Sequence, residues 1–110
     1  MDSRHRDEDR YSVRFQADAR AEDGSDEPVR ITNLSSWGCR FTVGRQAKLG
    51  KLVTLAVARI GQVDGQIKWT DGRTYGVHFD DQLPKVWLDH MRLFLSQPPA
   101  FVAERKGSRA

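Results

Sequence analysis

Apolar and polar side chains alternate strictly from residue 11 to residue 20. The apolar set is Tyr11, Val13, Phe15, Ala17 and Ala19, and the residues between them are Ser12, Arg14, Gln16, Asp18 and Arg20. This period places alternate side chains on opposite faces of a β-strand. The run therefore predicts an antiparallel strand that packs one face on a core and leaves the other in solvent.

Further segments with strand character follow at short intervals. After a loop at 21–27, a strand is expected to begin at Pro28 and the next to carry Cys39, Phe41 and Val43. Later strands are expected at 52–60, 66–70 and 74–79, with a loop at 44–51 and a turn around 61–65. Asp71-Gly72 is the strongest hairpin signal in the chain. Strands at this spacing predict an all-β fold, a closed or nearly closed six-stranded antiparallel barrel.

The apolar period changes after Asp80-Asp81. Spacings of three and four residues relate Leu83, Val86, Trp87, His90, Met91, Phe94 and Leu95. This stripe predicts an amphipathic C-terminal α-helix that plugs or flanks the barrel. We expect Asp80 or Asp81 to cap its start, Pro84 to occupy its first turn, and Pro98-Pro99 to stop it.

The chain divides into an arm, one folded domain and a tail. Its 110 residues are enough for one domain. Residues 1–10 have no apolar side chain between Met1 and Tyr11, so we expect a flexible arm there. The barrel and helix are expected at 11–97 and a disordered tail at 98–110. Without a signal sequence or an apolar run of about 18 residues, we expect a cytoplasmic protein that does not insert into membranes.

The formal net charge of +3 is unevenly distributed. Residues 1–27 carry nine acidic and five basic groups, whereas residues 28–110 carry six acidic and thirteen basic groups. A positive surface raises the local concentration of phosphates, which favours an anionic partner for the folded part. A solvated surface with its charges spread around the molecule accounts for the same excess.

The apolar phase slips by one residue at Asn33. Ile31 belongs to the apolar face, Asn33 takes the next position on that face, and the apolar phase restarts at Leu34. The slip predicts a β-bulge that presents Asn33 and Ser35 outward, with Gly38 supplying a positive φ or room for a close approach. Amide and hydroxyl groups mix donors and acceptors as a base edge does, although an ordinary turn contains the same residue types.

Two motifs occur in order along the chain. Arg6 and Arg10 form R-x-x-x-R, Asn33, Ser35 and Gly38 form N-x-S-x-x-G, and 22 residues separate Arg10 from Asn33. The pair resembles the signature of the PilZ domain family, R-x-x-x-R followed by [D/N]-x-S-x-x-G. The segments 65–69 and 76–79 also resemble two late strands of that family, so the resemblance covers about residues 5–96. It implies a PilZ-type β-barrel with a C-terminal helix.

The resemblance implies a function in signalling. The expected activity is that of a receptor for cyclic di-GMP that changes an interaction surface on binding, with an unidentified protein as downstream partner. Arg6 and Arg10 would contact phosphate and guanine, Asn33 and Ser35 the guanine edge or adjoining backbone, and Gly38 would allow close approach. Guanidinium forks pair bidentately with phosphate or with O6 and N7 of guanine, which fits this assignment.

Several features of ligand binding stay open. Asp7, Glu8 and Asp9 lie between the arginines and lower the local positive potential. The sequence does not decide whether one ligand or a stacked pair binds. We expect the ligand to order the arm and thereby provide the signal. The alternative function is a PilZ-like adaptor that contacts proteins and binds no nucleotide.

The remaining candidates receive structural interpretations. Trp69 and Trp87 fall in apolar phases and are predicted to be core. Trp37 is predicted to cover the core edge, with stacking on a base as the alternative. A nucleic-acid-binding barrel requires exposed aromatics flanked by Lys or Arg on one sheet face. Since Phe41 and Trp69 both fall in apolar phases, no DNA or RNA partner is expected.

Catalytic and metal chemistry are also not expected. Cys39 is the single cysteine, which excludes an internal disulfide and favours a small buried side chain. His78 and His90 lack a second ligand at metal spacing. A triad of Ser35, His78 and an Asp lacks a nucleophile elbow. We therefore expect no enzyme activity, no metal site and no cofactor beyond the nucleotide ligand.

Overall fold

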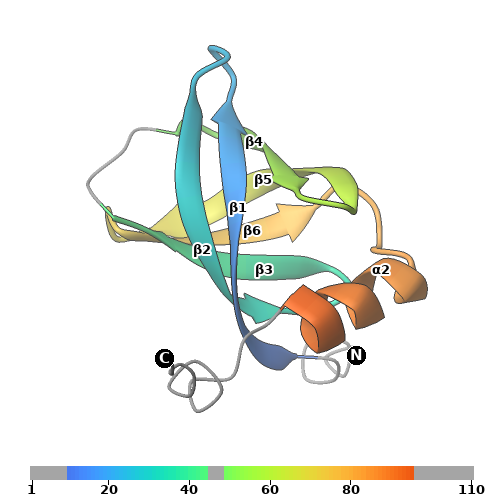
Figure 1. Ribbon diagram of the computed structural model, residues 1–110. Coiled ribbons are helices and arrows are strands. Elements are labelled where there is room, and N and C mark those ends of the chain that lie inside the picture. Colours follow the sequence, from blue (N-terminus) through green and yellow to red (C-terminus); the bar gives the residue numbers. More distant parts are fainter. Residues whose placement is uncertain (1–9, 45–48, 96–110) are drawn as a thin grey trace, which may run out of the picture.

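The computed structural model describes residues 10–44 and 49–95 (Figure 1). The predicted arm other than Arg10, and the predicted tail, lie outside the described residues. Six antiparallel strands form a closed barrel in the order β1-β2-β3-β6-β5-β4, which confirms the predicted all-β architecture. The strands are β1 (Tyr11–Ala21), β2 (Asp26–Leu34), β3 (Gly38–Val43), β4 (Leu52–Val57), β5 (Gly61–Thr70) and β6 (Thr74–Phe79).

The hairpin between β1 and β2 is longer than predicted. In place of a loop at 21–27, a tight turn joins the strands, with the amide of Ala21 donating to the carbonyl of Ser25 at 2.8 Å. The carboxylate of Asp23 accepts a bond from the Ser25 amide at 2.9 Å, and Gly24 takes a φ of 90°. Arg20 and Asp26 then pair across the strand ends at 3.0 Å. Local side-chain bonds therefore shorten the loop to a few residues.

The turn between β4 and β5 also lies earlier than predicted. It occupies residues 58–60, where the Ile60 amide donates to the carbonyl of Val57 at 3.0 Å and Arg59 has a φ of 71°. The segment expected to turn, 61–65, forms the first half of β5 instead. A Cβ on Gly65 would lie 2.7 Å from the carbonyl oxygen of His78. That glycine therefore marks a close approach of two strands and no turn.

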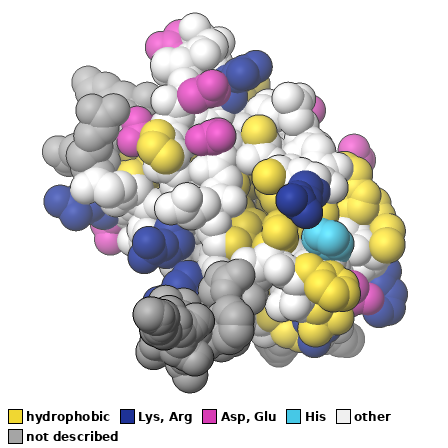
Figure 2. All heavy atoms as spheres, in the orientation of Figure 1, with side chains coloured by type: hydrophobic (Ala, Val, Ile, Leu, Met, Phe, Trp, Pro, Cys, Tyr) yellow, Lys and Arg dark blue, Asp and Glu magenta, His cyan; other side chains and the backbone are white. Residues whose placement is uncertain are grey.

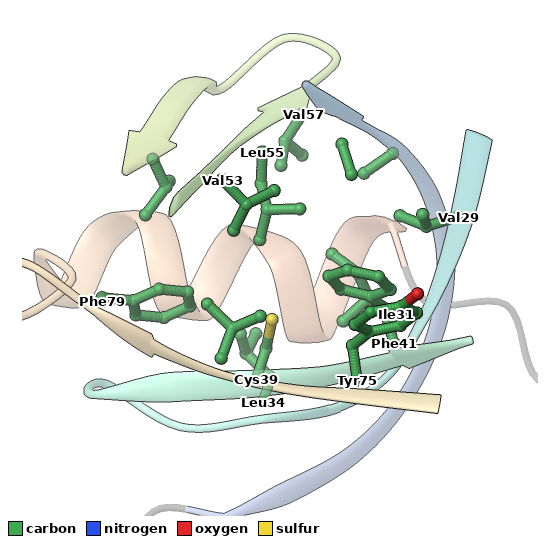
Figure 3. Packing of buried hydrophobic residues seen from close by; sticks show 14 of the residues in the cluster. Val29, Ile31, Leu34, Cys39, Phe41, Val53, Leu55, Val57, Tyr75 and Phe79 are labelled. Carbon is green, nitrogen blue, oxygen red and sulfur yellow. The ribbon is translucent and has the colours of Figure 1, made fainter. Parts of the chain in front are cut away.

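The core lies inside the barrel (Figure 3). Burial alternates along β1 as predicted, and inward side chains from all six strands converge on the interior. Each large apolar side chain buried in this way contributes about 1.5–3 kcal/mol. Cys39 is among the buried residues, as predicted. The largest side chains that are fully buried are Phe41, Phe79, Ile31, Leu34, Leu55 and Met91.

The C-terminal helix is confirmed, but its start differs from the prediction. It comprises α2 (Lys85–His90) and a π-helical continuation, η1 (Met91–Leu95). Pro84 is the N-cap, and no side chain caps the helix, so the predicted Asp80 or Asp81 cap is wrong. The carbonyl of Pro84 instead accepts bonds from the amides of Trp87 at 3.0 Å and Leu88 at 3.1 Å.

The buried face of the helix is rotated from the predicted stripe. Leu88 is buried, whereas Val86 and Phe94, both predicted to face the core, are 70% and 69% exposed. Apolar residues cover more than one side of this segment, so periodicity does not fix which side packs inward. Figure 2 shows hydrophobic side chains gathered at the lower right, the region of the C-terminal helix in Figure 1.

The helix flanks the barrel where β4 ends. In the described barrel, β1 pairs with β4 only over the segment from Asp18 to Ala21, so its first half is paired with β2 alone. There η1 contacts β1, and the guanidinium carbon of Arg92 lies 4.1 Å from the centroid of the Tyr11 ring. The helix thus covers the side that β4 leaves open. No helix in the described chain is long and apolar enough to cross a membrane.

Candidate functional site

A bulge in β2 sets the direction of Asn33. Ile31 pairs with Phe41 and Asn33 with Arg40, so Thr32 has no opposite residue on β3. The structure therefore confirms the bulge predicted from the phase slip. Because Arg40 is outward and exposed, its cross-strand partner Asn33 faces outward as well.

Arg10 contacts Asn33 directly. The strand pairing places Ser12 opposite Asn33, and the Arg10 side chain reaches the same point, where its Nη1 donates a hydrogen bond to Asn33 Oδ1. One arginine of the R-x-x-x-R motif thus meets the first residue of the N-x-S-x-x-G motif. The other arginine, Arg6, lies outside the described residues.

Ser35 is turned inward, contrary to the expectation that it faces solvent or ligand. It is buried, and its hydroxyl accepts a bond from the Trp37 amide at 3.2 Å and donates to the carbonyl of Gly38 at 3.4 Å. The Ser35 amide also donates to the Gly38 carbonyl, at 2.9 Å. In this structure Ser35 shapes the turn that joins β2 to β3.

Gly38 is required by the barrel itself. A Cβ at this position would collide with the carbonyl oxygen of Val77 on β6. A positive φ is not the reason, since the glycines with positive φ in the described chain lie elsewhere. Of the two roles expected for Gly38, the structure supports close approach, and the group that approaches is strand β6.

The thiol of Cys39 lies beneath this site. Burial raises the pKa of Cys39 to about 12, and the positive charge of Arg10 acts in the opposite direction. The effect of burial is the larger one, so the thiol stays protonated at neutral pH and does not act as a nucleophile. Arg10 itself is exposed, so its positive charge lies on the outer side of this end of the barrel.

Trp69 lies outside the core, so its predicted burial is wrong. Ile67 pairs with Val77 and Trp69 with Gly76, which makes Lys68 a bulge residue in β5. The bulge reverses the direction of the next side chain, and Trp69 is 46% exposed. Its indole lies across Gly76, and the guanidinium carbon of Arg40 is 5.8 Å from the ring centroid.

The other two tryptophans differ from each other. Trp87 packs against the core, as predicted. Trp37, predicted at the core edge, is 36% exposed and stacks on His78, with ring centroids 6.0 Å apart and planes at 21°. Of the two residues used to exclude nucleic acid, Phe41 is buried but Trp69 is exposed. One premise of that exclusion is therefore wrong.

The family model for the PilZ domain matches residues 4–97. The chain belongs to the PilZ domain family. PilZ domains are receptors for cyclic di-GMP and act as binding or adaptor domains rather than as enzymes. No curated protein matches the chain. The matched residues of this PilZ domain include both motifs.

Sequence reasoning missed the outward position of Trp69 in this PilZ barrel. A tryptophan has the same hydropathy on either face of a strand, so period alone does not place it. A glycine opposite an aromatic residue was the available signal, because an aromatic ring often covers the space that a cross-strand glycine leaves. Gly76 provides that space here.

Proposed function

We propose that this PilZ domain is a cyclic di-GMP receptor whose ligand site is formed by Arg6, Arg10, Asn33, Ser35 and Gly38. The contact between Arg10 and Asn33 carries the proposal. It brings one residue of each motif to the same point, although 22 residues separate them along the chain. A ligand that spans both motifs needs this arrangement.

The residues have different roles in this proposal. The Arg10 fork pairs with phosphate or with O6 and N7 of guanine, and the Asn33 amide reads the guanine edge. Ser35 acts as a positioning residue, since its hydroxyl bonds stay within the turn. Gly38 keeps that turn close to β6. Arg10 uses one N–H to donate to Asn33, so the other donors of its guanidinium and the N–H groups of the Asn33 amide are the groups that would meet the ligand.

Calorimetric titration tests the proposal. Cyclic di-GMP is expected to bind the full chain, with GTP as the ligand control. Arg6→Ala and Arg10→Ala are each expected to weaken binding at least tenfold, because a charge-assisted bond contributes about 1.5–3 kcal/mol. Arg73→Ala, which removes an exposed arginine from the hairpin between β5 and β6, is the matched control. Wild-type affinity in the Arg6/Arg10 double variant would overturn the assignment.

The output step has a separate test. The proposed signal is a new surface formed when Arg6 and Arg10 close on the ligand. Trypsin is then expected to cut at Arg4, Arg6 and Arg10 more slowly when cyclic di-GMP is saturating. Equal cutting rates with and without ligand, in a sample shown to bind it, would place the output elsewhere in the domain.

The adaptor function predicts a different result. If the protein is an adaptor, the titration with cyclic di-GMP should give no heat of binding although the protein is folded. Its contact surface would be the exposed side of the C-terminal helix, where Val86, Leu93 and Phe94 are all outward. The titration therefore separates the two functions.

A further inference from the structure

Three rows of outward positions cross neighbouring strands and follow the curved wall of the barrel. The middle row is Ser12, Asn33, Arg40, Gly76 and Trp69, each paired with the next across β1, β2, β3, β6 and β5. Two rows flank it on the neighbouring outward positions. The first is Gln16, Arg30, Thr42 and Thr74, and the third is Gly38, His78, Gln66 and Leu52. With strands about 4.8 Å apart, the middle row follows the barrel wall for about 19 Å.

The charged residues of the three rows are basic, although the carboxylate of Asp71 lies next to Thr74 at the end of the first row. The three rows contain Arg30 and Arg40 and no aspartate or glutamate. Lys68 lies beside the middle row at the β5 bulge, and its side chain is exposed. The next outward positions past the third row are acidic, Asp64 on β5 and Asp80 just after β6, and they bound the basic surface at that end. Such a surface attracts an extended anion that runs across the strands.

Aromatic rings lie within the same surface at two places. The Trp69 indole rests on Gly76 with 46% of the residue exposed, and Arg40 lies over its ring. His78 belongs to the third row, and Trp37 from the turn before β3 stacks on it. Gly76 and His78 are two residues apart on β6, so these places are about 7 Å apart along the strand. That spacing is about twice the 3.4 Å rise of stacked bases, so bases seated at both places are not stacked on each other.

We propose that this outward face binds single-stranded nucleic acid. One base takes the place of the Arg40 guanidinium over the exposed part of the Trp69 ring, which frees Arg40 to pair with a phosphate. A neighbouring base stacks at Trp37 and His78, and Arg30 and Lys68 neutralise further phosphates. Basic grooves with aromatic platforms bind single strands in this way, with little sequence preference, because every base has a flat face. A duplex keeps its bases stacked and paired, so it does not offer those faces to the rings.

Fluorescence anisotropy with a labelled ten-nucleotide oligothymidylate tests the proposal on the full chain. The single strand is expected to bind at 50 mM KCl, and a twenty-base-pair G·C-rich duplex, which stays paired at this salt concentration, at least tenfold more weakly. Trp69→Ala is expected to weaken single-strand binding at least tenfold. Phe94→Ala removes an exposed aromatic ring on the helix and is expected to leave the affinity unchanged.

The salt dependence supplies a second measurement. Arg40→Gln is expected to lower the slope of log affinity against log salt concentration by about 0.7, the value for one phosphate contact on a single strand. Lys85→Gln, an exposed cation on α2, is the matched control and is expected to leave the slope unchanged. Circular dichroism verifies that each variant is folded.

Three results would overturn the proposal. They are no binding of the single strand at 50 mM KCl, equal affinity of folded Trp69→Ala and wild type, and an unchanged salt slope in Arg40→Gln. Asn33 in the middle row and Gly38 in the third row also belong to the proposed cyclic di-GMP site, so the two surfaces overlap. The assay contains no cyclic di-GMP and the oligonucleotide contains no guanine, so the two binding activities are measured separately. Failure to bind cyclic di-GMP in calorimetry would leave the nucleic-acid result unaffected.

Discussion

The indole of Trp69 lies flat across Gly76, its partner on the neighbouring strand. A Cβ on residue 76 would be 2.7 Å from Trp69 Cδ1 and closer still to other ring atoms. Gly76 therefore determines where the exposed ring rests.

Replacing this glycine is expected to displace the ring. Gly76→Ala should lower the free energy of unfolding by about 1–3 kcal/mol, the usual cost of overpacking, and should shift tryptophan emission. Gly44→Ala is the matched control, because a Cβ there would meet nothing within 4 Å. Equal thermal unfolding curves for the two variants would contradict the tight contact at residue 76.

Truncating Trp69 is expected to have a smaller effect on stability than truncating a core residue. Since the ring is outside the core but about half covered, Trp69→Ala should lower the free energy of unfolding by about 1–2 kcal/mol, whereas Phe41→Ala should cost about 3–5 kcal/mol. Denaturant unfolding of the two variants provides the comparison. A loss at Trp69 as large as that at Phe41 would restore the core assignment.

The Cys39 thiol is expected to be unreactive in the folded protein. Burial excludes reagents and raises its pKa to about 12, so the fraction of thiolate at pH 8 is very small. A colorimetric thiol reagent should react at least a hundredfold more slowly with native than with denatured protein. Comparable rates would mean that the barrel opens readily around β3.

The hairpin between β5 and β6 is expected to contribute to stability in a pH-dependent way. The amides of Thr74 and Arg73 donate to the Asp71 carboxylate at 2.8 and 2.9 Å and hold its pKa below the ordinary 3.8. A lowered folded-state pKa stabilises the protein above the unfolded-state pKa, and this contribution is lost as the pH falls through the folded value.

Asp71→Asn isolates that contribution. The amide oxygen accepts the same two bonds but does not titrate. Below pH 3.8 the variant should therefore lose less stability than wild type, as measured by thermal unfolding across the acid range. Parallel pH curves for the two proteins would show that Asp71 is not responsible.

The two bulges show what hydrophobic period can and cannot predict. The bulge in β2 was predictable, because Ile31 and Leu34 mark the apolar phase on both sides of a polar Asn33. The bulge in β5 was not, because Trp69 continues the apolar phase of Ile67 although it faces solvent. At a bulge, a polar residue in an apolar position indicates that the side-chain direction has reversed. A large aromatic residue at that position gives no such indication.

The site was only partly predictable for a related reason. The motifs identified Arg10 and Asn33, but their contact depends on the register of β1 on β2, which contains its own irregularity between Ser12 and Phe15. The inward position of Ser35 depends on hydrogen bonds within a turn, and the spacing of apolar residues along the sequence does not predict such bonds. Pairing registers and turn hydrogen bonds arise from the folded chain as a whole.

The incomplete pairing of β1 gives the C-terminal helix a protective role. Before Asp18, the backbone of β1 has no strand partner on the side away from β2 in the described barrel, and the helix lies there with Arg92 over Tyr11. An uncovered strand of this kind templates pairing between molecules. Removing the chain from Lys85 onward should therefore expose the edge of β1. The truncated protein should aggregate through β1 while its soluble fraction still shows β-sheet structure.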